Sequence, residues 1–292
     1  MGNKSKRAII TGANGFIGQH LWDALIERDI EPIALDRHDL YTDVPALTEI
    51  IFHHKPHYIF HLAAYANHRG QHDDAQIVMA NYWATYNLLK ATQFLDYEAF
   101  INIGSSSMYG IKKEPMKETD SLEPDTFYAA TKAGACYLAR VYAKQYNKPV
   151  ANIIPFSVYG EGEAPFRLIP SVIKHLVSGQ EMLLNSNQPH DWIYVSDFIN
   201  GMMTVADNIQ AFKGQMVNVG TGFETTNKGI ADELVRISKR KLYDRHIKQT
   251  NPFDSPEWVA DNSLLQSFGW KPKVSLKDGL TRCWKYYSQD GN

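Results

Sequence analysis

A tyrosine and a lysine one helical turn apart form the clearest candidate for chemistry in this sequence. Tyr128 and Lys132 are four residues apart in Tyr128-Ala-Ala-Thr-Lys132, so on a helix they share one face. The stretch from 128 to 146 contains no proline, which favours a long helix. A tyrosine with a pKa of about 10 is a poor base at neutral pH, but an ammonium about 4 Å away would favour the phenolate by roughly 4 kcal/mol at an effective dielectric of about 20. The pair could therefore act as a general acid/base.

This spacing also occurs by chance on many helix surfaces, so its meaning depends on the elements that would position it. The first of these begins with the apolar run Arg7-Ala-Ile-Ile-Thr11, continues through Gly12-Ala-Asn-Gly15-Phe-Ile-Gly18 and enters a helical stretch at 19–27. The glycines permit a tight turn and let the backbone approach a pyrophosphate, whose charge lies at the helix N-terminus. The sequence therefore predicts a strand, glycine turn and helix that bind a dinucleotide.

An acidic residue lies where a dinucleotide-binding unit needs one. Asp36 follows the predicted strand Glu31-Pro-Ile-Ala-Leu35, about 20 residues past the glycines. A carboxylate there would accept hydrogen bonds from the adenosine ribose and repel a 2′-phosphate, which favours NAD over NADP. The neighbouring Arg37 leaves NADP open as the alternative.

Strands and helices alternate along the first part of the chain. Buried strands are predicted over 58–64 and 99–103, and helices over 45–54 and 74–95. This order predicts an α/β fold with a doubly wound parallel sheet of the Rossmann type. In such a sheet, ligands bind at the carboxyl ends of the strands.

A run of three serines follows one of these predicted strands. Ser105 to Ser107 would lie at the same edge of the sheet as the glycine turn and Ala63-Ala64. A simple polar turn is one interpretation. The position at the carboxyl end of a strand favours the other, in which the hydroxyls bind an oxygen of the substrate.

Composition argues against several classes of protein. The 292 residues are 44% hydrophobic and 21% charged, and the net charge of −2 gives no basis for binding nucleic acid or an anionic membrane. No apolar run approaches the roughly 20 residues that span a bilayer, and the polar N-terminus leads straight into a strand. Cys136 and Cys283 are too few for a disulfide framework or a zinc site, so we expect reduced thiols, a cytoplasmic location and no metal.

Together these motifs resemble those of the extended short-chain dehydrogenase/reductase family, and within it the NAD-dependent nucleotide-sugar epimerase, dehydratase and 4-ketosugar reductase group. The motifs that carry the resemblance are the glycine turn, His61-Leu-Ala-Ala64, the serine run with Tyr109-Gly110, and the Tyr128/Lys132 pair. The resemblance extends nearly to the C-terminus through Asp191-Trp-Ile-Tyr-Val-Ser-Asp197, Val217-Asn-Val-Gly-Thr-Gly222 and the segment 258–272.

The resemblance implies a role for each matching position. Ser105, Tyr128 and Lys132 would form the catalytic trio, in which Tyr128 is the acid/base and Lys132 binds the nicotinamide ribose and lowers the pKa of the tyrosine. Tyr128 and Lys132 would also contact the cofactor. The other cofactor-binding residues would come from the glycine turn, the ends of the strands and the helix over 74–95: Gly12, Asn14, Gly15, Phe16, Ile17, Gly18, Asp36, Arg37, Leu62, Ala63, Ala64 and Asn81.

The resemblance also implies two lobes and an assembly. A dinucleotide-binding domain over 1–158, joined again by about 188–221, would precede a smaller substrate-binding lobe formed mainly by 159–292. In the relatives, the helices that correspond to 74–95 and 128–147 pair across a two-fold axis, so we expect a homodimer. The helix over 128–147 has an apolar face formed by Ala135, Leu138, Ala139 and Tyr142. This face would belong either to the dimer interface or to the chain's own core.

Two positions after Ser105 depart from the dehydratases of the group. Those enzymes usually have an acidic pair after the hydroxyl residue, whereas this chain has Ser106 and Ser107. Without a carboxylate to help expel water from the sugar, dehydration loses support.

The expected binding groups for a nucleotide diphosphate are also changed. Family members commonly have Arg-Asp where this chain has His190-Asp191, and a second arginine expected near Asn251 is absent. Ser157 stands where an asparagine commonly contacts the sugar. Arg167 or Lys174 could supply the missing charge, although Arg167 could equally be a surface cation. We expect Ser106, Ser107, Ser157, Arg167 and His190 to contact the substrate.

Three functions are consistent with the sequence. An NAD-dependent nucleotide-sugar epimerase, most simply at C4, removes and returns the same hydride with the Ser/Tyr/Lys trio. A nucleotide 4-ketosugar reductase that consumes NADH or NADPH is the alternative, favoured by the compact segment after Asp36. A cofactor-binding sensor without catalysis is disfavoured by the retained trio. The sequence names neither the sugar nor its nucleotide.

Overall fold

The computed structural model of the chain describes residues 5–65, 73–185, 187–246 and 257–289. Contacts group the chain into two compact units: unit 1 is Met1–Gly110, Glu118–Pro155 and Ile199–Asn218, and unit 2 is Ile111–Lys117, Phe156–Phe198 and Val219–Asn292. The resemblance implies that the chain re-enters the dinucleotide-binding domain at about residue 188. The observed units differ there, because the strand that follows residue 188 pairs with strands of unit 2.

Unit 1 is built on a six-stranded sheet in the order β2-β1-β3-β4-β5-β9. Strands β2, β1, β3, β4 and β5 each pair in parallel with the next strand in this order. In this register Ile9 of β1 lies between Ile33 of β2 and Ile59 of β3. Strands β3 and β4 are buried along their whole length, as expected where helices cover both faces. The Rossmann-type parallel sheet predicted from the sequence is confirmed. Its strands are β1 (Lys6–Thr11), β2 (Ile30–Leu35), β3 (Tyr58–His61), β4 (Ala99–Ile103), β5 (Val150–Pro155) and β9 (Met216–Val219).

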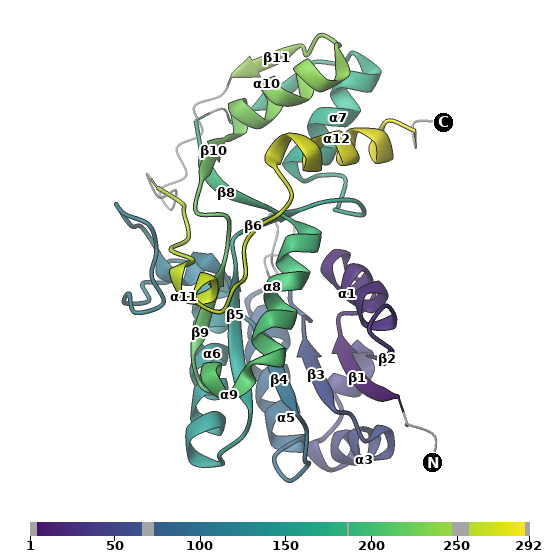
Figure 1. Cartoon of the computed structure of the whole chain (residues 1–292), viewed down its shortest axis with the longest axis vertical. Coiled ribbons are helices and arrows are strands. Elements are labelled where there is room, and N and C mark those ends of the chain that lie inside the picture. Colours follow the sequence, from purple (N-terminus) through teal and green to yellow (C-terminus); the bar gives the residue numbers. More distant parts are fainter. Residues whose placement is uncertain (1–4, 66–72, 186, 247–256, 290–292) are drawn as a thin grey trace. The chain divides into compact units, whose positions relative to one another are not determined.

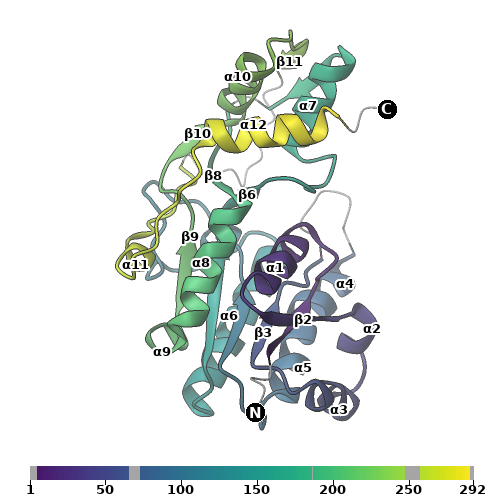
Figure 2. The same ribbon diagram turned by 45° about the vertical axis from the view of Figure 1, so that its right-hand side comes forward.

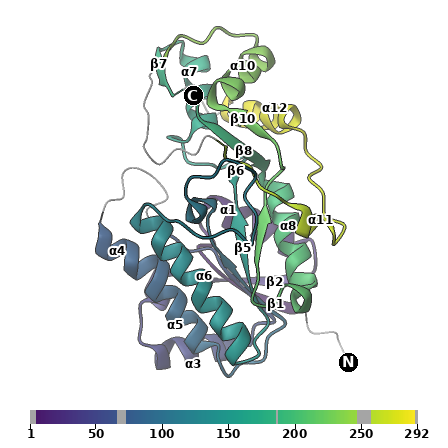
Figure 3. The same cartoon turned by 90° about the vertical axis from the view of Figure 1, so that its left-hand side faces the viewer.

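Helices cover both faces of this sheet. Helices α3, α5 and α6 pack side by side on one face, while α1 and the 199–207 part of α8 cover the other (Figures 1 and 3). No helix among the described residues combines the length and the apolar character needed to cross a bilayer. The helices here are α1 (Phe16–Ile26), α2 (Arg37–Leu40), α3 (Val44–His54), α4 (Asp74–Val78), η1 (Met79–Trp83), α5 (Ala84–Ala91), η2 (Ser106–Tyr109), α6 (Phe127–Gln145), α8 (Val195–Asp207) and α9 (Ile209–Phe212).

The helix predicted over 74–95 is not a continuous α-helix. Between α4 and α5, the five residues of η1 form a π-helical turn. A π turn has a wider hydrogen-bond spacing than an α-helix, so the side chains that follow it no longer keep the α-helical register. Asn81 lies within this turn and is fully buried. The prediction of a regular helix over 74–95 is wrong at this point.

The apolar face of α6 that could have served a dimer belongs largely to the core of unit 1. Ala135 and Ala139 are fully buried, and Tyr142 is 6% exposed. Ala139 and Tyr142 join a cluster that contains Leu88 of α5, while Leu138 packs against its edge. The described apolar side chains that stay accessible on η1 and α6 are instead Met79, Trp83, Phe127, Tyr137 and Val141.

Unit 2 contains two small sheets and three packed helices. One sheet has the order β10-β8-β6, and a second pairs β11 with β7. Helices α7, α10 and α12 pack against one another (Figures 1 and 2). The motif Asp191–Asp197 is divided between two elements, because β8 ends at Tyr194 and α8 begins at the next residue. The elements are β6 (Ser157–Tyr159), α7 (Leu168–Ser178), β7 (Met182–Leu184), β8 (Pro189–Tyr194), β10 (Glu224–Thr226), α10 (Asn227–Ser238), β11 (Asp244–His246), α11 (Ser263–Gln266) and α12 (Leu276–Tyr287).

Candidate active site

Four of the predicted segments follow neighbouring strands of the unit 1 sheet. Asp36 comes after β2, Gly12 after β1, Leu62 after β3 and Ser105 after β4. Because these strands are parallel, their carboxyl ends meet at one edge of the sheet. The structure therefore brings these groups to a common edge.

The glycine turn between β1 and α1 has no room for side chains at two positions. Gly12 has a φ of +71°, and a Cβ on it would lie 2.9 Å from the backbone nitrogen of Ala63. A Cβ on Gly18 would lie 2.3 Å from the carbonyl oxygen of Gly12. Gly15 caps α1 without a side-chain hydrogen bond, so the first N–H groups of the helix remain available to a ligand. This turn fits a pyrophosphate, and Asn14, Phe16 and Ile17 belong to the same turn and first helical residues.

Asp36 caps the short helix α2 rather than standing free at the end of β2. Its Oδ1 accepts a hydrogen bond from the backbone nitrogen of Asp39 at 3.0 Å, and the Asp39 carboxylate accepts from the backbone nitrogen of Asp36. The bond from the Asp39 backbone lowers the pKa of the Asp36 carboxyl, so this side chain stays ionised. Both Asp36 and Arg37 are exposed, and a negative charge at this edge suits a ribose better than a 2′-phosphate.

The serine run forms the start of the 3₁₀ turn η2. Ser105 is its N-cap, and the Oγ atoms of Ser105 and Ser107 lie 2.7 Å apart. Ser105 Oγ also accepts a hydrogen bond from the backbone nitrogen of Ser107 at 3.3 Å. Ser106 is buried, whereas Ser105 and Ser107 are half-buried. The two hydroxyls at the edge are therefore Ser105 and Ser107, and Ser106 is the least accessible of the three.

Tyr128 and Lys132 lie in the first turns of α6, as their spacing predicts. Thr126 caps this helix by accepting a hydrogen bond from the backbone nitrogen of Ala129. Tyr128 is half-buried, and Lys132 is only 2% exposed. Burial lowers the pKa of the Lys132 ammonium from 10.5 to about 8, so it remains mostly charged at pH 7.

The Lys132 ammonium has no hydrogen-bond partner among the described residues. A buried charge without a partner is costly unless a ligand satisfies it. The hydroxyls of a bound nicotinamide ribose would provide such partners. The edge that carries Lys132 and the glycine turn thus fits a dinucleotide.

Asn81 is the predicted cofactor-site residue whose contacts the sequence could not specify. Its Nδ2 donates to the carbonyl oxygen of Tyr65 at 3.0 Å and to Thr131 Oγ1 at 3.2 Å. Thr131 in turn donates to the carbonyl oxygen of Tyr128 at 2.9 Å. Asn81 therefore holds the first turn of α6. Sequence reasoning missed Thr131, whose only signal was its position next to Lys132.

Unit 2 holds the remaining substrate candidates. Arg167 is the N-cap of α7 with a side chain 46% exposed, and its Nε lies 3.7 Å from Glu163 Oε1. Glu163 is 8% exposed, its Oε2 is buried without a hydrogen-bond partner, and burial raises its pKa to about 8. Glu163 was not predicted as a site residue, although it lies four residues before Arg167.

His190 lies near this pair. Burial, together with the charge of Arg167, lowers the pKa of the His190 ring to about 4, so the ring is neutral at pH 7. Its Nδ1 is buried without a partner among the described residues, and its ring packs against those of Trp192 and Trp258. A neutral histidine cannot replace the charge of an arginine. Arg167 is therefore the better candidate for binding an anion in unit 2.

Two further positions singled out from the sequence, Asp191 and Ser157, also lie in unit 2. Asp191 is structural, because its carboxylate accepts hydrogen bonds from the backbone nitrogens of Thr221, Gly222 and Ala260. Ser157 begins β6 and is half-buried. Asn251, near which an arginine is missing, lies outside the described residues.

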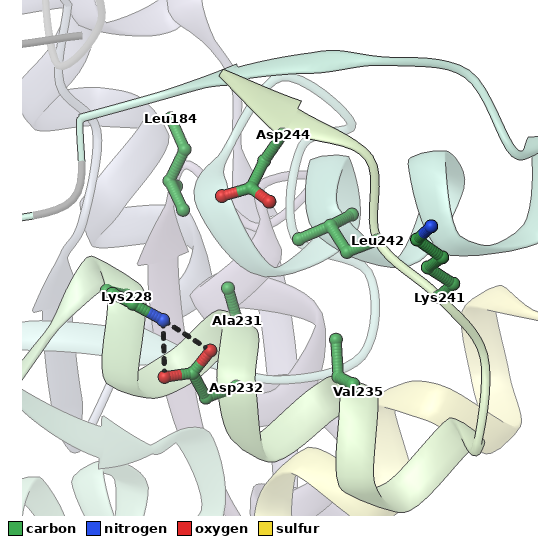
Figure 4. Close-up of a pocket in the computed structure, with 8 residues that line it drawn as sticks. All are labelled: Leu184, Lys228, Ala231, Asp232, Val235, Lys241, Leu242 and Asp244. Atoms are coloured by element: carbon green, nitrogen blue, oxygen red, sulfur yellow. Dashed lines mark hydrogen bonds and ion pairs between the residues drawn. The ribbon is translucent and has the colours of Figure 1, made fainter. Parts of the chain in front are cut away.

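Unit 2 also contains a pocket of about 240 Å³ that none of the predicted site residues lines. It lies between α10 and the segment that leads from α10 into β11 (Figure 4). Its charged lining is largely paired within the protein: Lys228 contacts both carboxylate oxygens of Asp232 at 2.7 Å, and the Lys241 ammonium lies over the ring of Tyr243. This pocket is not a candidate for the chemistry suggested by the sequence.

The parallel sheet, the glycine turn and the Tyr/Lys helix at its carboxyl edge define a Rossmann-type dinucleotide-binding enzyme. Residues 8–220 match the NAD dependent epimerase/dehydratase family, and the chain belongs to that family. Its members are enzymes and its cofactor is NAD, which confirms the enzyme class, the cofactor and the family resemblance predicted from the sequence.

Relatives within this family are distant in sequence but similar over their full length. Human dTDP-D-glucose 4,6-dehydratase is 24% identical, with 99% of this chain and 92% of the relative covered. The dTDP-glucose 4,6-dehydratase 1 of Escherichia coli is 26% identical over 96% of this chain and 92% of the relative. UDP-glucuronic acid 4-epimerase from Bacillus cereus, solved with UDP-glucuronic acid and NAD, is 25% identical with a TM-score of 0.87, covering 97% of this chain and 99% of that one.

Proposed function

We propose that this chain is an NAD-dependent epimerase that inverts C4 of a nucleotide sugar. The observation that carries this proposal is the hydroxyl pair at the end of β4. Ser105 and Ser107 hydrogen-bond to each other, and neither Ser106 nor Ser107 is acidic. Serine hydroxyls can position a sugar oxygen, but they are too weakly acidic to protonate a departing hydroxyl as a carboxylic acid can. The site thus favours reversible oxidation over dehydration, although dehydratases are among the relatives.

The protein's part in this reaction is to position the sugar and to move one proton. Ser105 would donate to the C4 oxygen, and Tyr128 would take the hydroxyl proton and later return it. Lys132, charged at pH 7, stabilises negative charge on the tyrosine oxygen across one helical turn. NAD, when bound, supplies the hydride acceptor and then the hydride donor. The glycine turn and Asp36 would hold the dinucleotide, with the carboxylate of Asp36 selecting NAD over NADP.

Reduction of a 4-ketosugar is the second candidate function. The short segment after Asp36, which holds only the four-residue helix α2 before α3, is the observation that favours it. An epimerase must retain its transiently reduced cofactor, so no net change at the nicotinamide absorbance is expected. A reductase exchanges its cofactor at each turnover.

Incubation with candidate nucleotide sugars separates the two functions. We expect the purified protein to convert a nucleotide sugar to its C4 epimer without added cofactor, detected by chromatography or NMR. If no epimer forms with any sugar and NADH is oxidised in the presence of a nucleotide 4-ketosugar, the protein is a reductase. The Tyr128→Phe variant serves as the control for contaminating enzymes.

The diphosphate of the substrate would bind to Arg167 in place of the missing arginines. Arg167 is half-exposed, and among the described residues its ion-pair partner is Glu163, whose Oε1 lies 3.7 Å from Nε. This contact leaves the terminal nitrogens of Arg167 available for an anion. Arg167→Ala should weaken binding of the nucleotide sugar by about 1.5–3 kcal/mol, as for a charge-assisted hydrogen bond, without changing NAD affinity. Arg236→Ala, which removes an exposed arginine on α10, is the matched control. Equal binding by the Arg167 variant and the wild type would move the phosphate site to Lys174, or to His190 in its protonated form.

A homodimer through the outer surfaces of η1 and α6 is the proposed assembly. Trp83, Tyr137 and Val141 are between 40 and 47% exposed there and give these two elements accessible apolar surface for a partner subunit. Replacing Val141 with glutamate should convert a dimer into monomers in sedimentation equilibrium. Val141→Ala is the control, and a monomeric wild type would contradict the assembly.

A further inference from the structure

A buried histidine at the end of β3 lies between two hydroxyl groups. His61 is 1% exposed, its Nδ1 lies 2.8 Å from Thr11 Oγ1, and its Nε2 lies 3.0 Å from Thr85 Oγ1. Thr11 is the last residue of β1, immediately before the glycine turn, and Thr85 is in α5 immediately after the π turn. The imidazole thus connects the turn that would hold the pyrophosphate to the helix that contains Asn81.

The other hydrogen bonds of the two threonines determine which ring nitrogen carries the proton. The Thr85 hydroxyl donates to the carbonyl oxygen of Asn81 at 2.8 Å, so toward His61 it must accept, and Nε2 must be the donor. Thr11 Oγ1 accepts from the backbone nitrogen of Ala63 at 3.1 Å and has its own proton left to donate to Nδ1. The hydrogen bonds are all satisfied only if His61 is neutral with its proton on Nε2.

The environment of the ring supports the neutral form. Burial and the charge of Lys132 lower the pKa of His61 to about 3. A second proton would also meet the proton of the Thr11 hydroxyl, which already has the Ala63 N–H as its donor. His61 therefore does not exchange protons during a reaction at neutral pH. Its role is to hold two segments in register.

The hydrogen bonds continue from Asn81 to the catalytic helix. The Asn81 carbonyl is held by Thr85, its side-chain oxygen accepts from the backbone nitrogen of Tyr65 at 2.8 Å, and its Nδ2 donates to Thr131 Oγ1. Thr131 then donates to the carbonyl oxygen of Tyr128. A displacement of the helix at Asn81 would therefore shift the first turn of α6.

We infer that His61 is a positioning residue that couples the glycine turn to the helix carrying Tyr128 and Lys132, through Thr11 on one side and Thr85 and Asn81 on the other. Imidazole suits this role because a neutral ring offers one acceptor and one donor on opposite sides of a rigid frame. The hydrogen bonds themselves do not depend on the reaction, and only the turnover readout rests on the proposed function.

Two substitutions of His61 separate its contact with Thr11 from its contact with Thr85. In His61→Asn, the side-chain oxygen can replace Nδ1 and accept from Thr11, but the contact to Thr85 is lost. In His61→Gln, the longer amide can replace Nε2 and donate to Thr85, but the acceptor for Thr11 is lost. We expect His61→Gln to weaken NAD binding by about 5- to 100-fold with a smaller effect on kcat, the range for leaving a buried polar group without its partner. His61→Asn should instead lower kcat and have the smaller effect on NAD binding.

Four measurements test the inference, and three of them require no sugar substrate. NAD affinity by fluorescence titration and kcat are compared with those of His57→Asn, a control at the other end of β3 whose Nδ1 accepts from the backbone of Arg7. In the wild type, ¹⁵N NMR should show an Nε2–H tautomer that does not titrate between about pH 5 and 8. Thr85→Val, which keeps His61, should increase deuterium exchange over residues 127–133.

A His61 ring that titrates in this range, or that carries its proton on Nδ1, overturns the inference without any variant. Equal effects of both His61 variants on NAD binding and kcat would also overturn it, because they would indicate a merely structural role. If no nucleotide sugar is converted at all, the proposed function fails, whereas the NMR, titration and exchange results still decide the role of His61.

Discussion

Replacing Lys132 with methionine should stabilise the fold while abolishing activity. The ammonium is 2% exposed, and burial lowers its pKa from 10.5 to about 8. At about 1.36 kcal/mol per pH unit, this difference means that keeping the charge inside the protein costs roughly 3 kcal/mol at pH 7. Methionine has a similar length, no charge and a flexible side chain, so it can occupy the same space without this cost.

The pH dependence of the free energy of unfolding tests independently whether the charge on Lys132 destabilises the fold. Between pH 8 and 10.5 the unfolded chain binds more protons at Lys132 than the folded chain does, so wild-type stability should rise with pH in this window. The cost is present in full below pH 8 and disappears above 10.5. The advantage of Lys132→Met should therefore fall from roughly 3 kcal/mol at pH 7 to roughly 1 kcal/mol at pH 9.5.

Urea unfolding of both proteins at the two pH values measures this difference. Lys144→Met, in the last turn of the same helix, is the matched control, because Lys144 is exposed and its replacement should change stability by less than about 0.5 kcal/mol. NAD affinity and turnover are measured in parallel and should fall in Lys132→Met alone. A variant less stable than the wild type at pH 7, or a difference that does not change with pH, would refute the reasoning. Turnover near the wild-type value would refute the assigned role.

Three further substitutions test separate parts of the site. Tyr128→Phe removes the transferable proton while keeping the ring, so turnover should fall by roughly 10²–10⁴-fold while NAD binding, followed by titration, persists; near wild-type turnover would contradict its role. Asp36→Ala should narrow the preference for NAD over NADP in titrations with both, and tighter binding of NADP by the wild type would point to Arg37 as a phosphate ligand. Glu163→Gln concerns pH: because burial raises the pKa of Glu163 from 4.5 to about 8, the wild type should lose stability relative to this variant as pH rises between these values, by about 1–3 kcal/mol for one unsatisfied buried group. Thermal unfolding at pH 5 and 8 measures this, and parallel curves for the two proteins would count against it.

Features that depend on neighbouring residues could be predicted from the sequence. The glycine turn follows from the need for a positive φ at Gly12 and close backbone contact at Gly18, both of which are local. The shared face of Tyr128 and Lys132 follows from the geometry of one helical turn. The Rossmann-type sheet follows from the alternation of short apolar runs with amphipathic segments, because parallel strands need crossover helices. These features gave the fold, the family and the cofactor.

Features that depend on contacts between distant segments required the tertiary structure. A π turn that contains the buried Asn81 interrupts the helix predicted over 74–95, and residue periodicity carries no sign of that turn. The faces of α6 could not be assigned from the sequence, since Ala139 and Tyr142 are apolar whether they meet α5 of the same chain or another subunit. Glu163 lacked any periodic signal, and its raised pKa follows from burial that only the folded chain creates. The proton on Nε2 of His61 was likewise decided by Thr11 and Thr85, which lie 50 and 24 residues away in the sequence and meet at one ring only after folding.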